Sequence, residues 1–477
     1  MLSLTPRTTR FAPTPKYSFL ISSTGSCLLA SSAQRAAFGF TGRTQQTLVF
    51  PYYGNWAPRF GLAWQPFGTG KVVVRGGFGL FTDLPNFNNQ HFVNNNPITG
   101  TSILFSTSSG APTLVGGVPV TSANVFSAGG TPPLADQFIS LYFSPNYKDP
   151  TVEEWSLGVQ DQLSQSVALE VNYIGNHGYH LGALHLPGNQ PAPTPPNGSL
   201  QANRPYPDFG TFLYTSPEAI SNYNALQIKL NKRFSNGFSL LGAFTWQNAF
   251  DNNEGDEGFG ASTGNFNPQN DNCLSCNYGQ SYANAHKRFV VSGIWQLPVG
   301  EGQRFLNRGG VVNAILGGWQ ASGIYSLQSG FPFTVVSNRD WSNSLSNLPL
   351  PDRTCNGNNG PKSVAEWFDT SCFTTTLLQA AFNAGTPRYG NEVRNGLIGP
   401  TYNNLDFALL KNFSLSERFK LQFRFETFNT FNHANFSTPN STANTATNGQ
   451  ITSTVGSANG TGVNANRDIQ FALKLSF

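Results

Sequence analysis

The sequence has few charged residues. They make up 11% of its 477 residues, about half the share usual in soluble proteins. Asn, Ser, Thr and 49 glycines replace the missing Lys and Glu, and aromatic residues make up 13%. These residues favour strands and turns over helices, so the composition argues against a helical or α/β enzyme. The net charge of +4 is small for this length and no basic run occurs, so nucleic acid is not an expected partner.

Long hydrophobic runs and two common motifs, one of metalloproteases and one of nucleotide-binding proteins, are missing as well. No segment has the run of about 18 consecutive apolar residues that a transmembrane helix needs. Neither HExxH nor the phosphate-binding GxxxxGK[ST] pattern occurs. Three histidines (His177, His180 and His185) lie close in sequence but lack a carboxylate partner there, and the acidic segment 251–258 lacks EF-hand spacing. We therefore predict no enzymatic activity, no metal site and no cofactor.

The last residues of the chain, RDIQFALKLSF, show a strict period of two. Ile469, Phe471, Leu473, Leu475 and Phe477 alternate with polar or small residues. This pattern predicts a β-strand with one apolar face and one polar face. A soluble sandwich that ends on such a strand is one interpretation. The other is the closing strand of an outer-membrane barrel, whose apolar face meets lipid.

The whole chain is predicted to contain about eleven strands of this kind, mostly of transmembrane length. We expect them at residues 59–67, 71–81, 153–163, 167–175, 223–234, 238–250, 288–300, 318–328, 405–413, 418–428 and 469–477. Short and long connections alternate between them. The short turns are 68–70, 164–166, 235–237 and 414–417. The long segments, rich in Asn, Gly, Ser and Pro, are 83–150, 176–221, 251–286, 330–403 and 432–466.

This alternation predicts the fold class. Outer-membrane barrels carry tight turns on the periplasmic side and long loops on the outer side. A soluble sandwich or propeller has no reason to place every long loop at the same end. We therefore expect an all-β protein, an antiparallel up-and-down transmembrane barrel with short periplasmic turns and long extracellular loops.

The segment RFKLQFRFE illustrates the two faces. Phe419, Leu421, Phe423 and Phe425 have one parity and are expected to face lipid. The residues of the other parity are charged or amide-bearing, which suits a wet lumen. These lumen-facing candidates are Lys420, Gln422, Arg424 and Glu426.

An odd count of strands has a consequence for completeness. Single-chain bacterial barrels have even strand numbers, and an unpaired strand edge in hydrocarbon costs several kcal/mol per orphaned backbone group. About eleven strands therefore describe an incomplete barrel. We expect residues 56–477 to be the C-terminal portion of a larger barrel, and residues 1–55 to be a poorly defined leader or upstream loop remnant.

Several ordered motifs resemble a known family. WAPRFGLAWQPFGTGKVVVRGGFGLFTD, VEEWSLGVQDQLSQSVALEVNYIGNHGYHL, YNALQIKLNKRFSNGFSLLGAFTWQNAFD, GGWQASGIYSLQSGFPFTV and FKLQFRFETFNTFNHANF are similar to TonB-dependent receptors of the Oar-like type. The resemblance runs from about residue 56 to the end. It implies an outer-membrane barrel of about 22 strands that is occluded by an N-terminal plug. It also implies uptake of a substrate, driven by the inner-membrane TonB complex.

The chain departs from that family because no plug or TonB-contact segment is recognisable before Trp56. We therefore expect a plug-less fragment of a receptor in the outer membrane of a Gram-negative-type bacterium, with contact to TonB only through the missing part. Its expected partners are outer-membrane lipid and the assembly machinery. The resemblance implies that this machinery reads the final strand through Phe471, Leu473, Leu475 and Phe477. The alternative function is a secreted, soluble β-rich binding or adhesion protein.

Cysteine usage fits an extracellular surface. Cys273 and Cys276 lie in one predicted outer loop, and Cys355 and Cys372 lie in another. Two pairs in two loops predict disulfides that staple each loop in an oxidising compartment. A zinc site of four cysteines would require the two loops to meet.

Overall fold

The computed structural model describes residues 52–68, 70–83, 114–115, 118–119, 139–143, 147–207, 210–253, 268–414, 418–455 and 466–476. Its main feature is one large sheet with an antiparallel path of eleven strands. In order along the path, these are β1 (Arg59–Trp64), β2 (Val72–Thr82), β6 (Thr151–Ser164), β7 (Val167–Gly188), β8 (Phe212–Ser235), β9 (Phe238–Asp251), β11 (Lys287–Gln296), β12 (Trp319–Gln328), β18 (Tyr402–Ser414), β19 (Lys420–Phe428) and β21 (Asp468–Ser476).

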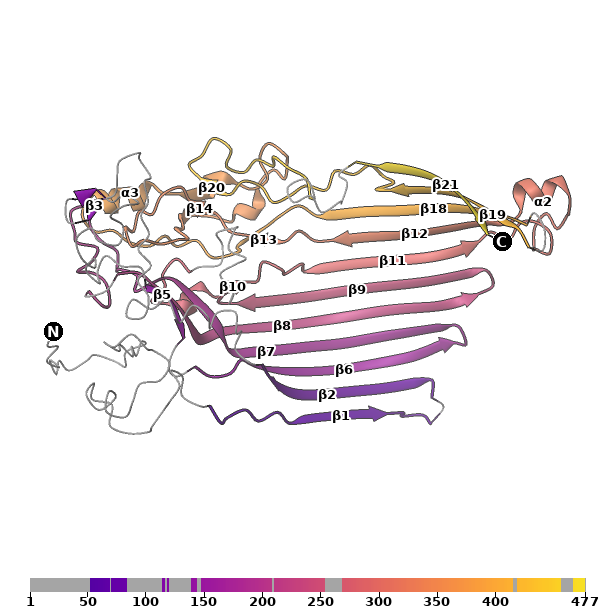
Figure 1. Cartoon of the computed structure of the whole chain (residues 1–477), viewed down its shortest axis with the longest axis horizontal. Helices are drawn as coiled ribbons and strands as arrows, with labels where there is room; N and C mark the ends of the chain where they lie inside the picture. The colour runs from indigo at the N-terminus through magenta and orange to yellow at the C-terminus, as the bar shows by residue number, and fades with distance from the viewer. Residues whose placement is uncertain are drawn as a thin grey trace.

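The path follows chain order, so the sheet is an up-and-down meander (Figure 1). Because each neighbouring pair is antiparallel, successive connections emerge at opposite ends of the strands. The two-residue turns 165–166 and 236–237 and the connection 297–318 lie at one end, which we call the short-turn end. The long connections leave from the opposite, long-loop end. The predicted fold class is confirmed, and each predicted strand corresponds to one strand of the path.

The sheet is open in the described residues. β1 and β21 stand at the two ends of the path, and each has one neighbour there. This agrees with the expected incomplete barrel.

Two strands are longer than predicted. The alternation predicts that one strand ends at residue 175 and that the next begins at 223, but β7 runs to Gly188 and β8 starts at Phe212. The extra residues pair with each other as far as Gly188↔Phe212, with register shifts on the way. Such irregularities disturb the period of two, which is the reason that the alternation did not reveal the extension. Beyond them, β5 (Ile139–Phe143) joins β8 in parallel, and β10 (Gly279–Gln280) joins β9.

The long segment 330–403 is not the open loop that its composition predicted. It contains β13 (Pro332–Phe333), β14 (Val336–Ser337), β15 (Asp352–Arg353), β16 (Phe373–Thr374), α3 (Thr376–Asn383) and β17 (Leu397–Ile398). With β20 (Thr442–Ala443), these elements form a compact unit at the long-loop end, which we call the cap (residues 329–401 and 429–455; Figure 1). The cap has its own hydrophobic core of Phe333, Val335, Phe368, Cys372, Phe373, Leu397 and Ala443.

The remaining described elements are short. β3 (Leu114–Val115) pairs with β4 (Val118–Pro119), and single 3₁₀ turns cover Leu274–Asn277, Gly357–Asn359 and Thr370–Cys372. At the short-turn end, the helix α2 (Val311–Leu316) lies between β11 and β12. In the described part of the chain, no helix has both the length and the apolar character to span a membrane.

Candidate functional site

The register of the sheet separates two faces. Residues directly opposite each other on antiparallel strands share a face. On β19 and β21, Leu421 stands opposite Leu475 and Phe423 opposite Leu473. Phe425 stands opposite Phe471, with ring centroids 5.3 Å apart. The residues Phe471, Leu473 and Leu475 are exposed. Phe477 lies outside the described residues.

The same face continues from β2 to β12 with an apolar row. One line of directly paired residues runs through β2, β6, β7, β8, β9, β11 and β12: Val74, Val159, Val171, Ile228, Phe244, Phe289 and Leu327. In water a face of this size would be costly, whereas hydrocarbon accepts it. We call it the apolar face.

Tryptophans border the apolar face at both ends. Trp64, Trp295 and Trp319 lie near the short-turn end of their strands, and Trp155 and Trp246 lie near the long-loop end. By register, all five belong to the apolar face. Amphipathic indole rings accumulate at the two membrane–water boundaries. On β9 the segment from Phe238, which pairs with Trp295, to Trp246 has the about 9–11 residues of a tilted transmembrane strand.

The opposite face is polar. Lys420, Gln422, Arg424 and Glu426 share the parity opposite to Leu421. Gln422 donates to Asn412 on β18 over 2.9 Å, and Arg424 lies 2.5 Å from Glu426. Elsewhere on this face, Lys229 and Glu170 form an ion pair of 3.8 Å. Several charged side chains of the polar face are thus paired with one another within the face.

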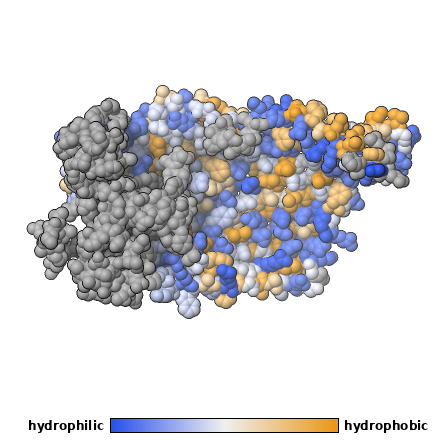
Figure 2. Space-filling model, viewed as in Figure 1, coloured by the Kyte–Doolittle hydropathy of each residue, from blue (hydrophilic) through white to orange (hydrophobic). Residues whose placement is uncertain are grey.

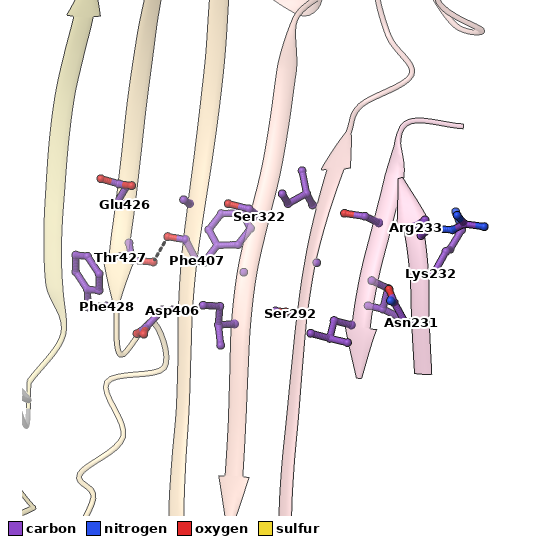
Figure 3. Close-up of a pocket in the computed structure, with 18 residues that line it drawn as sticks. Asn231, Lys232, Arg233, Ser292, Ser322, Asp406, Phe407, Glu426, Thr427 and Phe428 are labelled. Carbon is purple, nitrogen blue, oxygen red and sulfur yellow. Dashed lines mark hydrogen bonds between the residues drawn. The ribbon is translucent and has the colours of Figure 1, made fainter. Parts of the chain in front are cut away.

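The polar face carries a hollow of about 510 Å³ that crosses β8, β9, β11, β12, β18 and β19 (Figure 3). Polar residues that line it include Asn231, Ser239, Ser292, Ser322, Asp406 and Glu426. The acidic Asp406 and Glu426 lie toward one side of the hollow and Arg233 toward the other. A hollow lined by six neighbouring strands forms on the side toward which a sheet curves, so the polar face is concave.

The histidines among the described residues do not converge on a metal site. His185 is 1% exposed; its Nδ1 lies 2.8 Å from Asp271 Oδ1, and its Nε2 lies 2.8 Å from Ser216 Oγ. A catalytic triad has these partners, but here all three side chains are buried: Ser216 is only 5% exposed, and His185 and Asp271 are 1% exposed. We interpret the trio as a link between the β7–β8 hairpin and the loop after β9. His177 contacts Asn222, and His180 contacts Tyr179 and Tyr52.

The predicted cysteine pairs lie in separate parts of the long-loop end. Cys273 and Cys276 form one disulfide, and Cys355 and Cys372 form the other. Asp369 lies beside Cys355 and Cys372, and these three are the group of metal-type ligands that the described residues bring together. Because both sulfurs are in the disulfide, they are not available as thiolate ligands.

Sequence reasoning missed the buried charges of the cap. Glu392 is 4% exposed, and burial raises the pKa of its carboxyl to about 7, although Arg353 at 3.9 Å opposes the shift. Arg388 holds Asp352 at 2.6 Å, and Arg394 holds Asp251 at 2.5 Å. The two residues of each pair lie far apart in sequence, so no local sequence pattern predicts these ion pairs.

Comparison with known proteins identifies the family to which the chain belongs. The family model described as "Outer membrane beta barrel domain" matches residues 4–470. No curated protein matches the sequence. Among solved structures, the chain is similar to the outer membrane transporter YddB from Escherichia coli, with 10% identity and a TM-score of 0.45 over 88% of this chain and 40% of that one.

Two further structures are similar at the same level. The ferric preacinetobactin receptor BauA from Acinetobacter baumannii has 11% identity and a TM-score of 0.38, over 88% of this chain and 36% of that one. The iron transporter FrpB from Neisseria meningitidis has 9% identity and a TM-score of 0.37, over 88% and 39%. The chain spans about two fifths of the length of these structures. Since the family model covers nearly the whole sequence, the chain belongs to the outer-membrane β-barrel family, and its location is the outer membrane.

Proposed function

We propose that the chain forms the wall of a TonB-dependent receptor of the Oar-like type, which takes up a substrate across the outer membrane. The observation that carries this proposal is the division of one meandering sheet into an apolar face with tryptophans at both ends and a concave polar face. Family membership supports the membrane setting.

In this proposal the polar face lines a wet lumen. Lys420, Gln422, Arg424 and Glu426 are the lumen-facing residues of β19, and the hollow between Arg233 and Asp406 is part of the passage. Interiors of this class of barrel are polar because water fills them, whereas the outer band is apolar. The cap then stands at the extracellular mouth, where it contacts substrate first.

The open edges of the sheet require partners in the membrane. β1 and β21 each expose backbone groups that hydrocarbon does not satisfy. We propose that further strands complete the barrel at both edges, and that a plug and TonB-contact segment belong to the complete receptor. We also propose that Phe471, Leu473 and Leu475, with Phe477, form the signal that the assembly machinery reads.

Orientation in the membrane is tested by surface labelling of intact cells. The remaining cysteine of the chain, Cys27, is first replaced by serine. In this Cys27→Ser background, Leu377→Cys places a thiol on α3 of the cap, where the native side chain is 61% exposed. Gln165→Cys places the matched thiol on an exposed tight turn at the short-turn end. A membrane-impermeant maleimide should label position 377 on intact cells and position 165 only after lysis.

The outcomes separate the two functions. Recovery in the outer-membrane fraction with labelling at position 377 supports the receptor. A detergent-independent soluble monomer that labels equally at both positions would instead support the secreted binding or adhesion protein and overturn the barrel.

Transport itself is tested genetically. Deleting the gene in its own bacterium should abolish growth on a nutrient that supports the parent strain. Disabling the inner-membrane TonB system should abolish growth on the same nutrient. If no nutrient separates the deletion strain from its parent while the receptor is expressed, the uptake function is wrong.

A further inference from the structure

The connection between β11 and β12 places an exposed apolar helix at the short-turn end of the sheet. All the large apolar side chains of α2 are exposed: Val311 by 75%, Val312 by 41%, Ile315 by 60% and Leu316 by 44%. Phe305 and Leu306, earlier in the same connection, are 53% and 52% exposed. In Figure 1 α2 projects beyond the ends of the strands, and in Figure 2 hydrophobic residues gather at this end of the molecule.

Hydrogen bonds hold α2 in one orientation. Asn313, on its polar side, accepts from the backbone N–H of Glu301 over 2.9 Å, so that side faces its own connection. Residues 311, 312, 315 and 316 then share the opposite side, as the helical period requires. The apolar side of α2 is therefore turned away from the protein.

The helix also lies on the apolar side of the sheet. The indole Nε1–H of Trp319 donates to the carbonyl of Ile315 over 2.9 Å, and the ammonium of Lys411 donates to the carbonyl of Gly317. Trp319 and Lys411 stand opposite each other, and Lys411 stands opposite Phe423, so both belong to the apolar face. The side chains that bind the C-terminal end of α2 thus come from the face that meets lipid.

We propose that α2, with Phe305 and Leu306, is an interfacial anchor that lies in the head-group and acyl boundary of the membrane leaflet at the short-turn end. Its occupant is a phospholipid surface. The apolar side of α2 continues the apolar face of an outer-membrane protein beyond the row of Trp64, Trp295 and Trp319. Helices that lie in this boundary bury their apolar side about 5–10 Å deep and present basic residues to lipid phosphates.

The charges near α2 suit this position. The connection contains Arg304 and Arg308 against the single acidic Glu301. A net positive charge favours an anionic phospholipid surface. The proposal depends on the membrane location of the chain and not on what it transports.

The test uses the complete receptor that contains this chain, folded into vesicles of phosphatidylcholine and phosphatidylglycerol. In the Cys27→Ser background, an environment-sensitive fluorophore is attached at Ile315→Cys, where the side chain is exposed and no core contact is lost. The matched control carries the fluorophore at Gln165→Cys, on a tight turn at the same end. Lipids with a quencher just below the head groups report on a depth of about 5–10 Å.

We expect the emission at position 315 to shift to shorter wavelength and to be quenched by these lipids, and the emission at position 165 to stay water-like. A companion pair labels Val311→Cys with and without Ile315→Lys. The lysine should abolish quenching at position 311 while circular dichroism shows an unchanged sheet. Equal quenching at positions 315 and 165 overturns the proposal. A short-wavelength emission at 315 that lipid quenchers do not reach also overturns it, since a protein would then cover the helix.

Discussion

Arg394 and Asp251 form a buried ion pair although they lie 143 residues apart in sequence. Nη2 of Arg394 lies 2.5 Å from Oδ1 of Asp251, and the two side chains are 1% and 11% exposed. The guanidinium Nε–H also donates to the carbonyl of Asn277 over 3.0 Å. One side chain of the cap therefore joins the end of β9 to the loop that follows it.

Arg394→Ala should loosen this junction strongly. The substitution leaves the Asp251 carboxylate buried without its cation, which typically costs about 3–5 kcal/mol. Hydrogen exchange of the cap backbone at residues 390–398 should accelerate. The control is Lys229→Ala, which breaks a pair whose side chains are 46% and 31% exposed and should cost less than about 1 kcal/mol. Equal effects of the two variants would contradict the role of Arg394.

Phe423→Arg should destabilise the folded barrel, because position 423 lies on the apolar face opposite Leu473. An arginine on the lipid-facing side lowers the free energy of unfolding by about 2–4 kcal/mol near the bilayer midplane. The same substitution at Leu421, closer to the membrane boundary, should cost less. Gln422→Arg, on the polar face, should be nearly silent. Unfolding of each variant by denaturant in the same vesicles measures the difference. If Phe423→Arg and Gln422→Arg destabilised the barrel equally, the assignment of the two faces would be wrong.

Deleting residues 467–477 should abolish insertion into the outer membrane. The deletion removes β21, which pairs with β19 at nine positions from Phe428↔Asp468 to Lys420↔Ser476. The backbone groups of β19 would then form a new unpaired edge in hydrocarbon. Fractionation of cells that express the truncated receptor shows whether it reaches the membrane. Normal insertion would mean that this segment is neither a required strand nor a signal.

The cap should be more stable at pH 5 than at pH 8. Burial raises the pKa of Glu392 from 4.5 to about 7, so the folded cap binds the proton more tightly than the unfolded chain. This contribution to the free energy of unfolding is at most about 3 kcal/mol. It is fully present below about pH 4.5 and is lost as the pH rises through about 7. Limited proteolysis of the cap across this range measures the effect. Glu392→Gln, which cannot ionise, should flatten the profile; an unchanged profile would exclude this carboxyl as its source.

Removing the disulfide between Cys355 and Cys372 should weaken the cap more than removing the one between Cys273 and Cys276. The sequence separations are 17 and 3 residues. A closed loop of about 15 residues is worth about 3 kcal/mol in the chain-entropy description, and a shorter loop is worth less. The paired Cys→Ser variants are compared by proteolysis of the cap. Mass spectrometry before and after reduction tests whether each pair is oxidised in the native protein.

The strands could be read from the sequence because their signal is local. Alternation in Phe423–Phe425 and Phe471–Leu473 identifies a strand and assigns its two faces before any partner is known. The extension of β7 to Gly188 could not be read in this way. Its register shifts interrupt the period of two, and only pairing with Phe212 maintains the strand.

Composition misled the interpretation of the cap. Segment 330–403 is rich in the small and polar residues typical of loops, yet Phe333, Phe368 and Leu397 are almost fully buried in one core. These residues lie too far apart in sequence to show a period. Their burial depends on contacts that form only after the chain has folded back on itself.

The sequence by itself determined the strands, their order as a meander, the parity of their faces and the membrane class, since neighbours one or two residues apart carry that information. Tertiary structure decided which face is concave, where the charges of the cap are paired and where α2 lies. Curvature arises from the twist summed over many strands, and Arg394 meets Asp251 only through the packing of the cap against β9. Likewise, the place of α2 on the apolar side of the sheet follows from its contacts with Trp319 and Lys411, which lie on different strands.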